Sequence, residues 1–210
     1  DPEVRELVAH MSDSDVDRLK RGGHDFRKLH AAFAAAKAAK TVIAQVNPAM
    51  SITYGQSFIH KEDIDAFFYA EQALPEVQPT ELDPRTERIG QYVSLLVEDG
   101  ATIQLGVGKI CEAVTRYLSN HKDLGLHTEL MTDGVLELIK KGVINNRRKT
   151  FHPGKSVTSF CIGTKQLYDF VHQNPHIGFY PSEYVNSPSN IARNDRMVSI
   201  NSAIEVDLTG

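Results

Sequence analysis

The sequence has few cysteines, little net charge and no long apolar run, and each shortage excludes a class of protein. Its 210 residues include two cysteines, too few for a disulfide framework. We therefore expect a reducing compartment, the cytoplasm, or the mitochondrial matrix in a eukaryote. A net charge of −4 gives nucleic acid or an anionic membrane no electrostatic attraction. No apolar stretch approaches the roughly 20 residues that span a bilayer.

Both ends of the sequence indicate a piece of a longer protein. The chain opens at Asp1 without methionine, and its first residues are too acidic and polar for a secretory signal. It stops at Gly210 directly after an expected strand. With 41% hydrophobic and 24% charged residues, the composition is otherwise that of an ordinary globular protein.

Helix, strand and proline signals divide the chain into three parts. Residues 1–40 are expected to be helical, because the alanine-rich sequence after Asp25 has high helix propensity. Residues 41–46 are β-branched and apolar and end at Asn47-Pro48, which predicts a buried strand. Residues 71–84 carry three prolines among acidic residues, which predicts an extended linker. The expected units are 1–40, 41–84 and 85–210.

Strands and helices alternate after the linker, and this order predicts an α/β fold with a mainly parallel sheet and flanking helices. The first helix begins at Arg85, has Ile89, Val93 and Leu96 at helical spacing, and ends at Gly100. Strands are expected at 101–108, 124–131, 156–163, 177–181 and 197–208.

A strand–helix–strand unit over residues 101–134 brings together groups that can carry chemistry. A right-handed crossover makes both strands run the same way, so the turn Gly106-Val107-Gly108 and Glu129 meet at the carboxyl edge. Glycines allow close approach of a ligand, and the amides that open the next helix favour negative charge. A carboxylate can attack an activated acyl group, and nearby N–H groups can stabilise the oxyanion. The unit favours acyl transfer, with a merely solvated Glu129 as the alternative.

Several segments resemble the acetyl-CoA hydrolase and 4-hydroxybutyrate CoA-transferase family. They are GATIQLGVGKICEAV, DLGLHTELMTDGVLELIKKGVI, AQVNPAM, QSFIHKEDID, KTFHPGK, GTKQLYDFV, YPSEYVN and NDRMVSINSAIEVDLTG. The resemblance covers about residues 41–210. It implies that Glu129, the glutamate of the HTE motif, is the nucleophile. It also implies that the glycine loop binds coenzyme A through Gly106, Val107, Gly108, Lys109 and Ile110.

The family's reaction moves coenzyme A between a short-chain acyl-CoA and a free acid such as acetate, butyrate or 4-hydroxybutyrate. The resemblance implies a glutamyl-CoA thioester on Glu129, or hydrolysis where water reaches the intermediate. Coenzyme A would be a substrate, with no tightly bound cofactor, no metal and no nucleic-acid or membrane partner, and the protein would be a homodimer. Family chains are about twice as long, and the resemblance implies that this chain lacks the early strands of their first domain and the glycine-rich region after VDLTG. We therefore expect an incomplete N-terminal domain. A silent fragment that binds coenzyme A or only pairs with a partner is the main alternative.

Two departures from the family lie in the loop and at the start of the chain. The family's loop reads G-x-I-P-D-A-V, whereas Cys111 stands here in place of the proline that fixes φ at the helix start. The segment VAHMSDSDVDRLKRGGHDFRKLHAAFAAAKA instead resembles the homodimeric bacterial pyruvate dehydrogenase, a thiamine-dependent enzyme. The resemblance switches between Lys40 and Ile43, which predicts a chimera. No function is carried over from this segment.

Histidine and cysteine side chains near Glu129 each have two interpretations. Cys111 is a reactive thiol or, as we favour, a small apolar filler. His127 lies on the same strand face as Glu129 and either tunes the carboxylate or, as we favour, makes a structural hydrogen bond. His121, His127, His152 and Asp133 lack the compact spacing of a zinc site, so no metal is expected.

Charged and polar residues farther along the chain are open to two interpretations as well. Arg147, Arg148, Lys149 and Lys155 either meet the phosphates of coenzyme A or, as we favour, form a solvated charged loop. Asn201 and Ser202 fall inside the last expected strand. There they either line the acyl pocket or make buried backbone contacts.

Overall fold

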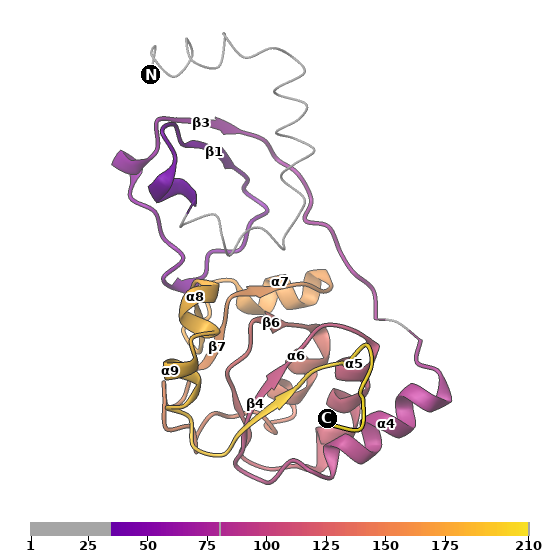
Figure 1. Ribbon diagram of the computed structural model, residues 1–210. Helices are drawn as coiled ribbons and strands as arrows, with labels where there is room; N and C mark the ends of the chain where they lie inside the picture. The colour runs from indigo at the N-terminus through magenta and orange to yellow at the C-terminus, as the bar shows by residue number, and fades with distance from the viewer. Residues whose placement is uncertain (1–34, 80, 210) are drawn as a thin grey trace.

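The computed structural model describes residues 35–79 and 81–209, so the helices expected within residues 1–34 lie outside the described residues. A small lobe and a larger α/β part are visible in Figure 1. In the lobe, β1 (Ile43–Val46) pairs in parallel with β3 (Ala66–Tyr69), and a 3-10 helix, η2 (Lys61–Asp63), precedes β3. The strand predicted at 41–46 is confirmed over Ile43–Val46, but it is half-buried to exposed rather than buried as predicted.

An extended segment connects the lobe to α4 and has no helix or strand over residues 70–79 and 81–83. Three hydrogen bonds hold this segment against the larger part, and we call it the pinned segment. Tyr168 Oη donates to Pro75 O at 2.9 Å, Glu76 Oε2 accepts from Lys165 N at 2.8 Å, and Val77 N donates to Gly163 O at 3.0 Å. The segment is therefore extended, as its prolines predict, but it is bound to the protein surface rather than a free tether. A domain boundary here stays a prediction.

Parallel pairing runs through the whole larger part and confirms the predicted α/β class. Three strands, β10 (Met197–Ile200), β4 (Thr102–Leu105) and β5 (Gly125–Leu126), form one run, and β2 (Tyr54–Gly55), β9 (Ile177–Phe179) and β7 (Ser156–Thr158) form a second. A bridge between His127 and Val157 joins the two runs. Beyond it, β6 (Leu130–Met131) pairs with β8 (Phe160–Cys161). The spatial order is β10, β4, β5/β6, β7/β8, β9, β2.

Helices cover the sheet in an arrangement that follows from this order. The connections from β4 to β5, from β6 to β7 and from β8 to β9 each lead to the next strand in the same direction across the sheet. Since such connections are right-handed, their helices lie on one face. The last connection returns from β9 to β10 and crosses the other face, where α8 and α9 lie (Figure 1). The helices are α4 (Pro84–Ser94), α5 (Lys109–Tyr117), α6 (Asp133–Lys140), α7 (Lys165–Val171), α8 (Ser182–Val185) and α9 (Pro188–Ile191), with a 3-10 turn, η3 (Leu118–Asn120), after α5.

α4 is a helix as predicted, but its buried face is different from the one that its apolar spacing suggests. α4 ends at Ser94, before the predicted end at Gly100, so Leu96 lies beyond the helix and is 78% exposed, whereas Gly90 and Ser94 are buried. A Cβ at Gly90 would lie 2.6 Å from the Cβ of Ala113 on α5. Small residues let the two helices approach closely. Because the contact depends on a residue without a side chain, the apolar spacing of the sequence does not indicate it.

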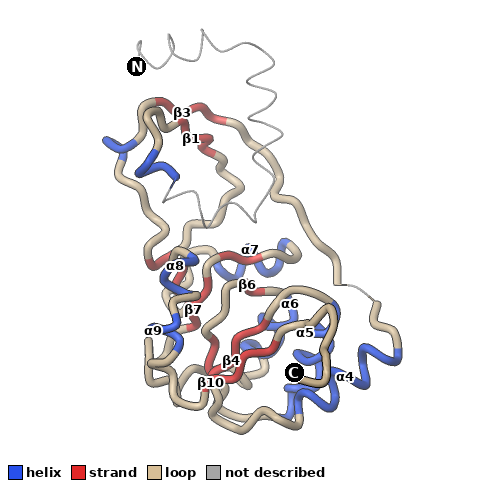
Figure 2. Tube along the Cα trace, in the orientation of Figure 1, coloured by secondary structure: helices blue, strands red, loops and turns tan. Residues whose placement is uncertain are grey.

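Two predicted strands are interrupted, each at a threonine. The hydroxyl of Thr128 accepts from Leu105 N at 3.1 Å and donates to Leu105 O at 2.9 Å. Thr158 Oγ1 likewise donates to Glu129 O at 3.0 Å. A hydroxyl that donates and accepts in place of a peptide unit breaks the regular ladder between neighbouring strands. The strands expected at 124–131 and 156–163 are therefore split into β5 and β6 and into β7 and β8. Figure 2 labels β6 and β7, which are short strands separated by loops.

The last predicted strand is too long. β10 ends at Ile200, and residues 201–209 are exposed and outside any strand. The placement of Asn201 and Ser202 in a core strand is therefore wrong. The physical reason is that β4, which pairs with β10, ends at Leu105 and turns away at Gly106, so the backbone after Ile200 has no neighbour to bond.

Candidate active site

Glu129 lies at the carboxyl edge of the sheet, at the level of the glycine turn. Thr102 pairs with Gly125, and continuing this register through the Thr128 hydroxyl places Glu129 opposite Gly106. On its other side, the carbonyl oxygen of Glu129 accepts from Ser159 N at 2.9 Å and from Phe160 N at 3.1 Å. The backbone of Glu129 is thus fixed at the point where the strand is broken.

The Glu129 side chain is half-buried and faces α8. Ser182, the first residue of that helix, donates from Oγ to Glu129 Oε1 at 3.1 Å. α8 lies on the face of the sheet away from α5, whose start carries the glycine turn (Figure 1). The structure therefore brings Glu129 and Gly106 to the same edge, with the carboxylate directed to the α8 side.

His127 occupies the same face, two residues before Glu129, and makes structural hydrogen bonds. It is 1% exposed; Nε2 donates to Val185 O at 2.8 Å and Nδ1 accepts from Asn194 Nδ2 at 3.4 Å. Burial lowers the pKa of His127, which agrees with a neutral ring that uses one nitrogen as donor and the other as acceptor. The favoured interpretation of His127 is confirmed.

The glycine turn opens α5 and lines a large cavity. Gly108 caps the helix with a φ of 116°, a backbone conformation that favours glycine. The cavity has a volume of about 550 Å³ and lies between the turn, the helices α5 and α6, and the pinned segment at Val77. Gly106, Val107, Gly108 and Lys109 line it, whereas Ile110 is half-buried and outside its lining.

A second cavity of about 200 Å³ lies on the other side of the Glu129 strand. Its lining is mostly apolar and comes from the lobe, from the pinned segment and from the sheet: Met50, Ser51, Thr53, Gln56, Ser57, Leu74, Ser159, Phe160, Cys161, Tyr168, Val171, Phe179, Tyr180 and Pro181. Glu129 itself is in the lining of neither cavity, but residues next to it line both. Its chain neighbour Leu130 lines the first, while Ser159, its partner on the next strand, lines the second.

Both cysteines are buried or half-buried and hold their protons tightly. Cys111 is 3% exposed, its Sγ donates to Ile200 O at 3.5 Å, and burial raises its thiol pKa. Burial raises the pKa of Cys161 to about 12. A thiol that resists ionisation is a poor nucleophile, so the interpretation of Cys111 as an apolar filler is confirmed.

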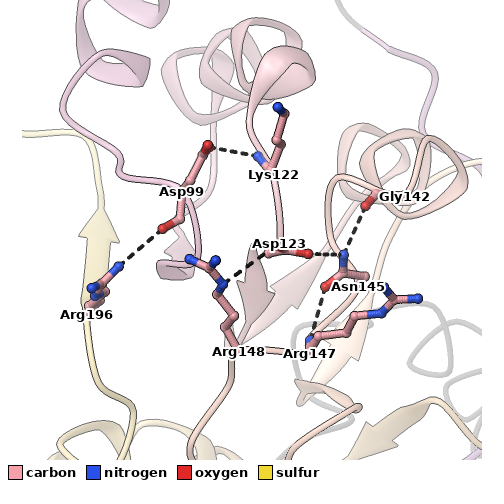
Figure 3. A network of polar contacts seen from close by, with 8 residues as sticks. All are labelled: Asp99, Lys122, Asp123, Gly142, Asn145, Arg147, Arg148 and Arg196. Atoms are coloured by element: carbon pink, nitrogen blue, oxygen red, sulfur yellow. Dashed lines mark hydrogen bonds and ion pairs between the residues drawn. The ribbon is translucent and has the colours of Figure 1, made fainter.

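The basic residues after α6 do not face the glycine turn. Figure 3 shows Arg148 and Arg147 at the opposite edge, where the strands begin. Arg148 Nε lies 3.6 Å from Asp123 Oδ2, and Arg147 N donates to Asn145 Oδ1 at 3.1 Å. Lys149 differs from the solvated loop that was expected: it is 4% exposed and its Nζ donates to Lys155 O at 2.7 Å. The interpretation of Lys149 as a solvated residue is wrong.

Ser182 and the second cavity are the parts of this site that sequence reasoning did not single out. Ser182 lies in the motif YPSEYVN, but serine at a helix start is ordinary and 53 residues separate it from Glu129. The cavity depends on contacts between the lobe and the sheet, and no local pattern indicates them. Within the described residues, no group of three or more His, Cys, Asp or Glu side chains could hold a metal ion. No helix among these residues is long and apolar enough to cross a membrane.

Known proteins match this chain in both sequence and structure. The model of the acetyl-CoA hydrolase/transferase C-terminal domain matches residues 163–210. A 4-hydroxybutyrate coenzyme A transferase of Clostridium kluyveri is 53% identical over 176 residues, which are 84% of this chain and 41% of that protein. A succinyl-CoA:cyclohexane-1-carboxylate CoA transferase of Geobacter metallireducens is 46% identical over the same share of this chain. Most of the chain belongs to the acetyl-CoA hydrolase/transferase family.

Solved structures in the family share the fold. A 4-hydroxybutyrate CoA-transferase of Porphyromonas gingivalis superposes with a TM-score of 0.79 at 48% identity, over 84% of this chain and 45% of that one. RipA from Yersinia pestis superposes with a TM-score of 0.78 at 38% identity, over 83% of this chain and 41% of that one. The chain spans about two-fifths of the length of the curated family members that it matches.

A short part of the chain also matches a different enzyme. The pyruvate dehydrogenase E1 component of Mycolicibacterium smegmatis is 48% identical over 61 residues, and that of Mycobacterium tuberculosis is 58% identical over 36 residues. These matches cover 6% and 4% of the two dehydrogenases. The predicted resemblance of a short segment to this enzyme is confirmed.

Proposed function

We propose that this chain transfers coenzyme A between a short-chain acyl-CoA and a carboxylic acid through a glutamyl-CoA thioester on Glu129. The observation that carries the proposal is the position of Glu129 at the carboxyl edge, opposite Gly106 and next to residues that line the two cavities. The larger cavity contains the glycine turn and the start of α5, whose free N–H groups favour the negative charge of a coenzyme A phosphate. The family membership of the surrounding sequence supports the same assignment.

The smaller cavity supports a short acyl chain in the acyl-CoA substrate. Its mostly apolar walls suit an aliphatic chain, because burying methylene groups there removes apolar surface from water. A volume of about 200 Å³ limits the occupant to a small group. The related proteins are named for 4-hydroxybutyrate, butyrate and acetate, among other acids, and we extend that class to this chain.

The reaction proceeds in four substitutions at carbonyl carbons. A carboxylate oxygen of Glu129 attacks the acyl-CoA carbonyl, the C–S bond breaks, and a mixed anhydride and a thiolate form. The thiolate attacks the Glu129 carbonyl carbon, which releases the first acid and leaves the glutamyl-CoA thioester. The acceptor carboxylate then attacks this thioester and expels the thiolate, which finally attacks the acceptor acyl carbon. A new acyl-CoA leaves, and Glu129 is a free carboxylate again.

Two other functions use the same residues differently. Water that attacks the anhydride or the thioester makes the site an acetyl-CoA hydrolase, which the matching family model includes by name. A chain with two-fifths of its relatives' length can instead bind coenzyme A without chemistry, or act only by pairing with a partner. We propose a homodimer as the assembled form.

Trapping the covalent intermediate tests the proposal. The chain is incubated with acetyl-CoA and then with hydroxylamine, which converts a glutamyl thioester or anhydride to a hydroxamate, and the peptides are analysed by mass spectrometry. Modification of the peptide that holds Glu129 supports transfer if it is absent in Glu129→Gln and retained in Glu98→Gln, which changes an exposed glutamate outside both cavities. Thermal stabilisation by coenzyme A without modification supports the binding module instead. Stabilisation by thiamine diphosphate would point to the dehydrogenase-like segment.

A further inference from the structure

The hydroxyl of Ser182 does not cap the helix to which it belongs. α8 has four residues, Ser182–Val185, and Pro181 stands at its N-cap without a side-chain hydrogen bond. Serine near a helix start commonly bonds a backbone N–H of its own first turn. Ser182 Oγ instead donates to Glu129 Oε1 at 3.1 Å. The helix thus directs its first side chain to the carboxylate.

α8 is too short to be stable by itself, so other contacts must fix its position. His127 Nε2 donates to the carbonyl of Val185, the last residue of α8, at 2.8 Å. Tyr184 stacks on Tyr180 with ring centroids 4.7 Å apart, and its hydroxyl lies 2.8 Å from His152 Nε2. Because His127 is two residues before Glu129, the strand that carries the carboxylate also fixes the helix that holds it.

We propose that Ser182 is a positioning residue that orients the Glu129 carboxylate for attack, with α8 fixed through His127. The proposal rests on the transferase function proposed above. A glutamate side chain has three rotatable bonds, and holding one oxygen reduces the freedom that must be lost on reaching the attacking geometry. The loss of this bond should therefore slow the first chemical step and leave the binding of acyl-CoA unchanged.

The test measures the initial rate at which hydroxylamine-trapped label accumulates on Glu129, as a function of acetyl-CoA concentration. For Ser182→Ala we expect a maximal rate about tenfold lower, with a half-saturating concentration within twofold of wild type. Ser182→Thr keeps a hydroxyl and should recover most of the rate. Ser187→Ala removes a nearby hydroxyl that contacts Ser189, and should leave both parameters unchanged.

A second measurement separates orientation from a general loss of structure. The carboxyl-carbon signal of Glu129, identified in ¹³C spectra by its absence in Glu129→Gln, should move in Ser182→Ala and not in Ser187→Ala. Ser182→Ala should also melt within a few degrees of wild type, because the bond lies at a half-buried helix end.

The outcomes distinguish the two proposals. A wild-type chain that forms no adduct contradicts the transferase and the positioning role together. If the adduct forms and Ser182→Ala keeps the wild-type rate within twofold, or the carboxyl signal does not move, the positioning role alone is overturned. A lower rate in Ser182→Ala that Ser182→Thr does not restore also contradicts the role of the hydroxyl.

Discussion

Lys149 lies directly over Gly125, and the absence of a side chain at Gly125 makes room for it. A Cβ added at Gly125 would be 2.7 Å from Lys149 Cγ. The ammonium group is buried and donates to the carbonyl of Lys155. Burial without an anionic partner among the described ion pairs lowers the pKa of Lys149 to about 7.

Stability should therefore rise with pH between 7 and 8.5. Lys149 has a lower pKa in the folded chain than in the unfolded one, so the unfolded chain binds more protons throughout this range. The free energy of unfolding, measured with urea, should increase by about 2 kcal/mol over the interval. Lys149→Met should flatten the slope. An equal slope in both proteins would assign the pH dependence to other groups.

The upper pH limit of 8.5 reduces the contribution of the two thiol groups to the measured stability. Cys111 and Cys161 have raised thiol pKa values in the folded chain, so above about 8.5 their ionisation in the unfolded chain lowers stability. The pKa of His127 and that of His152 are lowered by burial, so these rings affect stability only below about 6.5.

Gly90→Ala should destabilise the fold although alanine is the better helix former. The new Cβ would lie 2.6 Å from Ala113 Cβ and 2.8 Å from its backbone carbon, so α4 and α5 must move apart. Overpacking of this kind costs about 1–3 kcal/mol, more than the gain of at most about 1 kcal/mol from helix propensity. Gln91→Ala, at an exposed position on the same helix, is the control. Urea unfolding of the two variants should move in opposite directions.

Gly108→Ala should weaken coenzyme A binding beyond what backbone strain alone explains. Gly108 and Gly154 both have positive φ, 116° and 75°, and a Cβ at either would meet no atom within 4 Å. Substitution of either should cost about 1–2 kcal/mol of stability. Only Gly108 lines the larger cavity, so titration calorimetry should show weaker coenzyme A binding for Gly108→Ala and wild-type binding for Gly154→Ala. Equal affinities of the two variants for coenzyme A would show that the glycine turn does not take part in binding.

Leu74→Phe should shift the preference of the chain toward shorter acyl groups. Leu74 lines the smaller cavity, and a larger side chain there reduces the space for an aliphatic chain. Two methylenes distinguish butyryl-CoA from acetyl-CoA, and each is worth about 1–3 kcal/mol in a hydrophobic pocket. The rate of trapping at Glu129 should fall at least tenfold for butyryl-CoA relative to acetyl-CoA. Val77→Phe alters the same segment at the larger cavity and should not change this ratio.

Local rules were sufficient for the parts of the fold that depend on neighbouring residues. Asp83 caps α4 through its side chain, and alternating strands and helices predict the parallel sheet that brings Glu129 and Gly106 to one edge. These features follow from capping, periodicity and crossover geometry, which are all short-range in sequence.

Residues whose environment depends on distant segments were predicted less well. Lys149 is charged and follows two arginines, so its burial over Gly125 has no local signal. Gly90 is buried because it packs closely on Ala113 of α5, whereas Leu96 lies beyond the end of α4 and is exposed. Asn201 lies beyond the end of the pairing between β10 and β4. In each case a partner far along the chain decides the outcome.

The segment between the lobe and α4 contributes to both cavities, with Leu74 in the wall of one and Val77 in the wall of the other. Its carbonyl at Pro75 and its amide at Val77 are already engaged with the start of α7. A single proteolytic cut in this stretch would leave every strand of the sheet intact and still disturb one wall of each cavity. Resistance of this stretch to protease is therefore a sensitive indicator of whether it stays bound beside the two cavities.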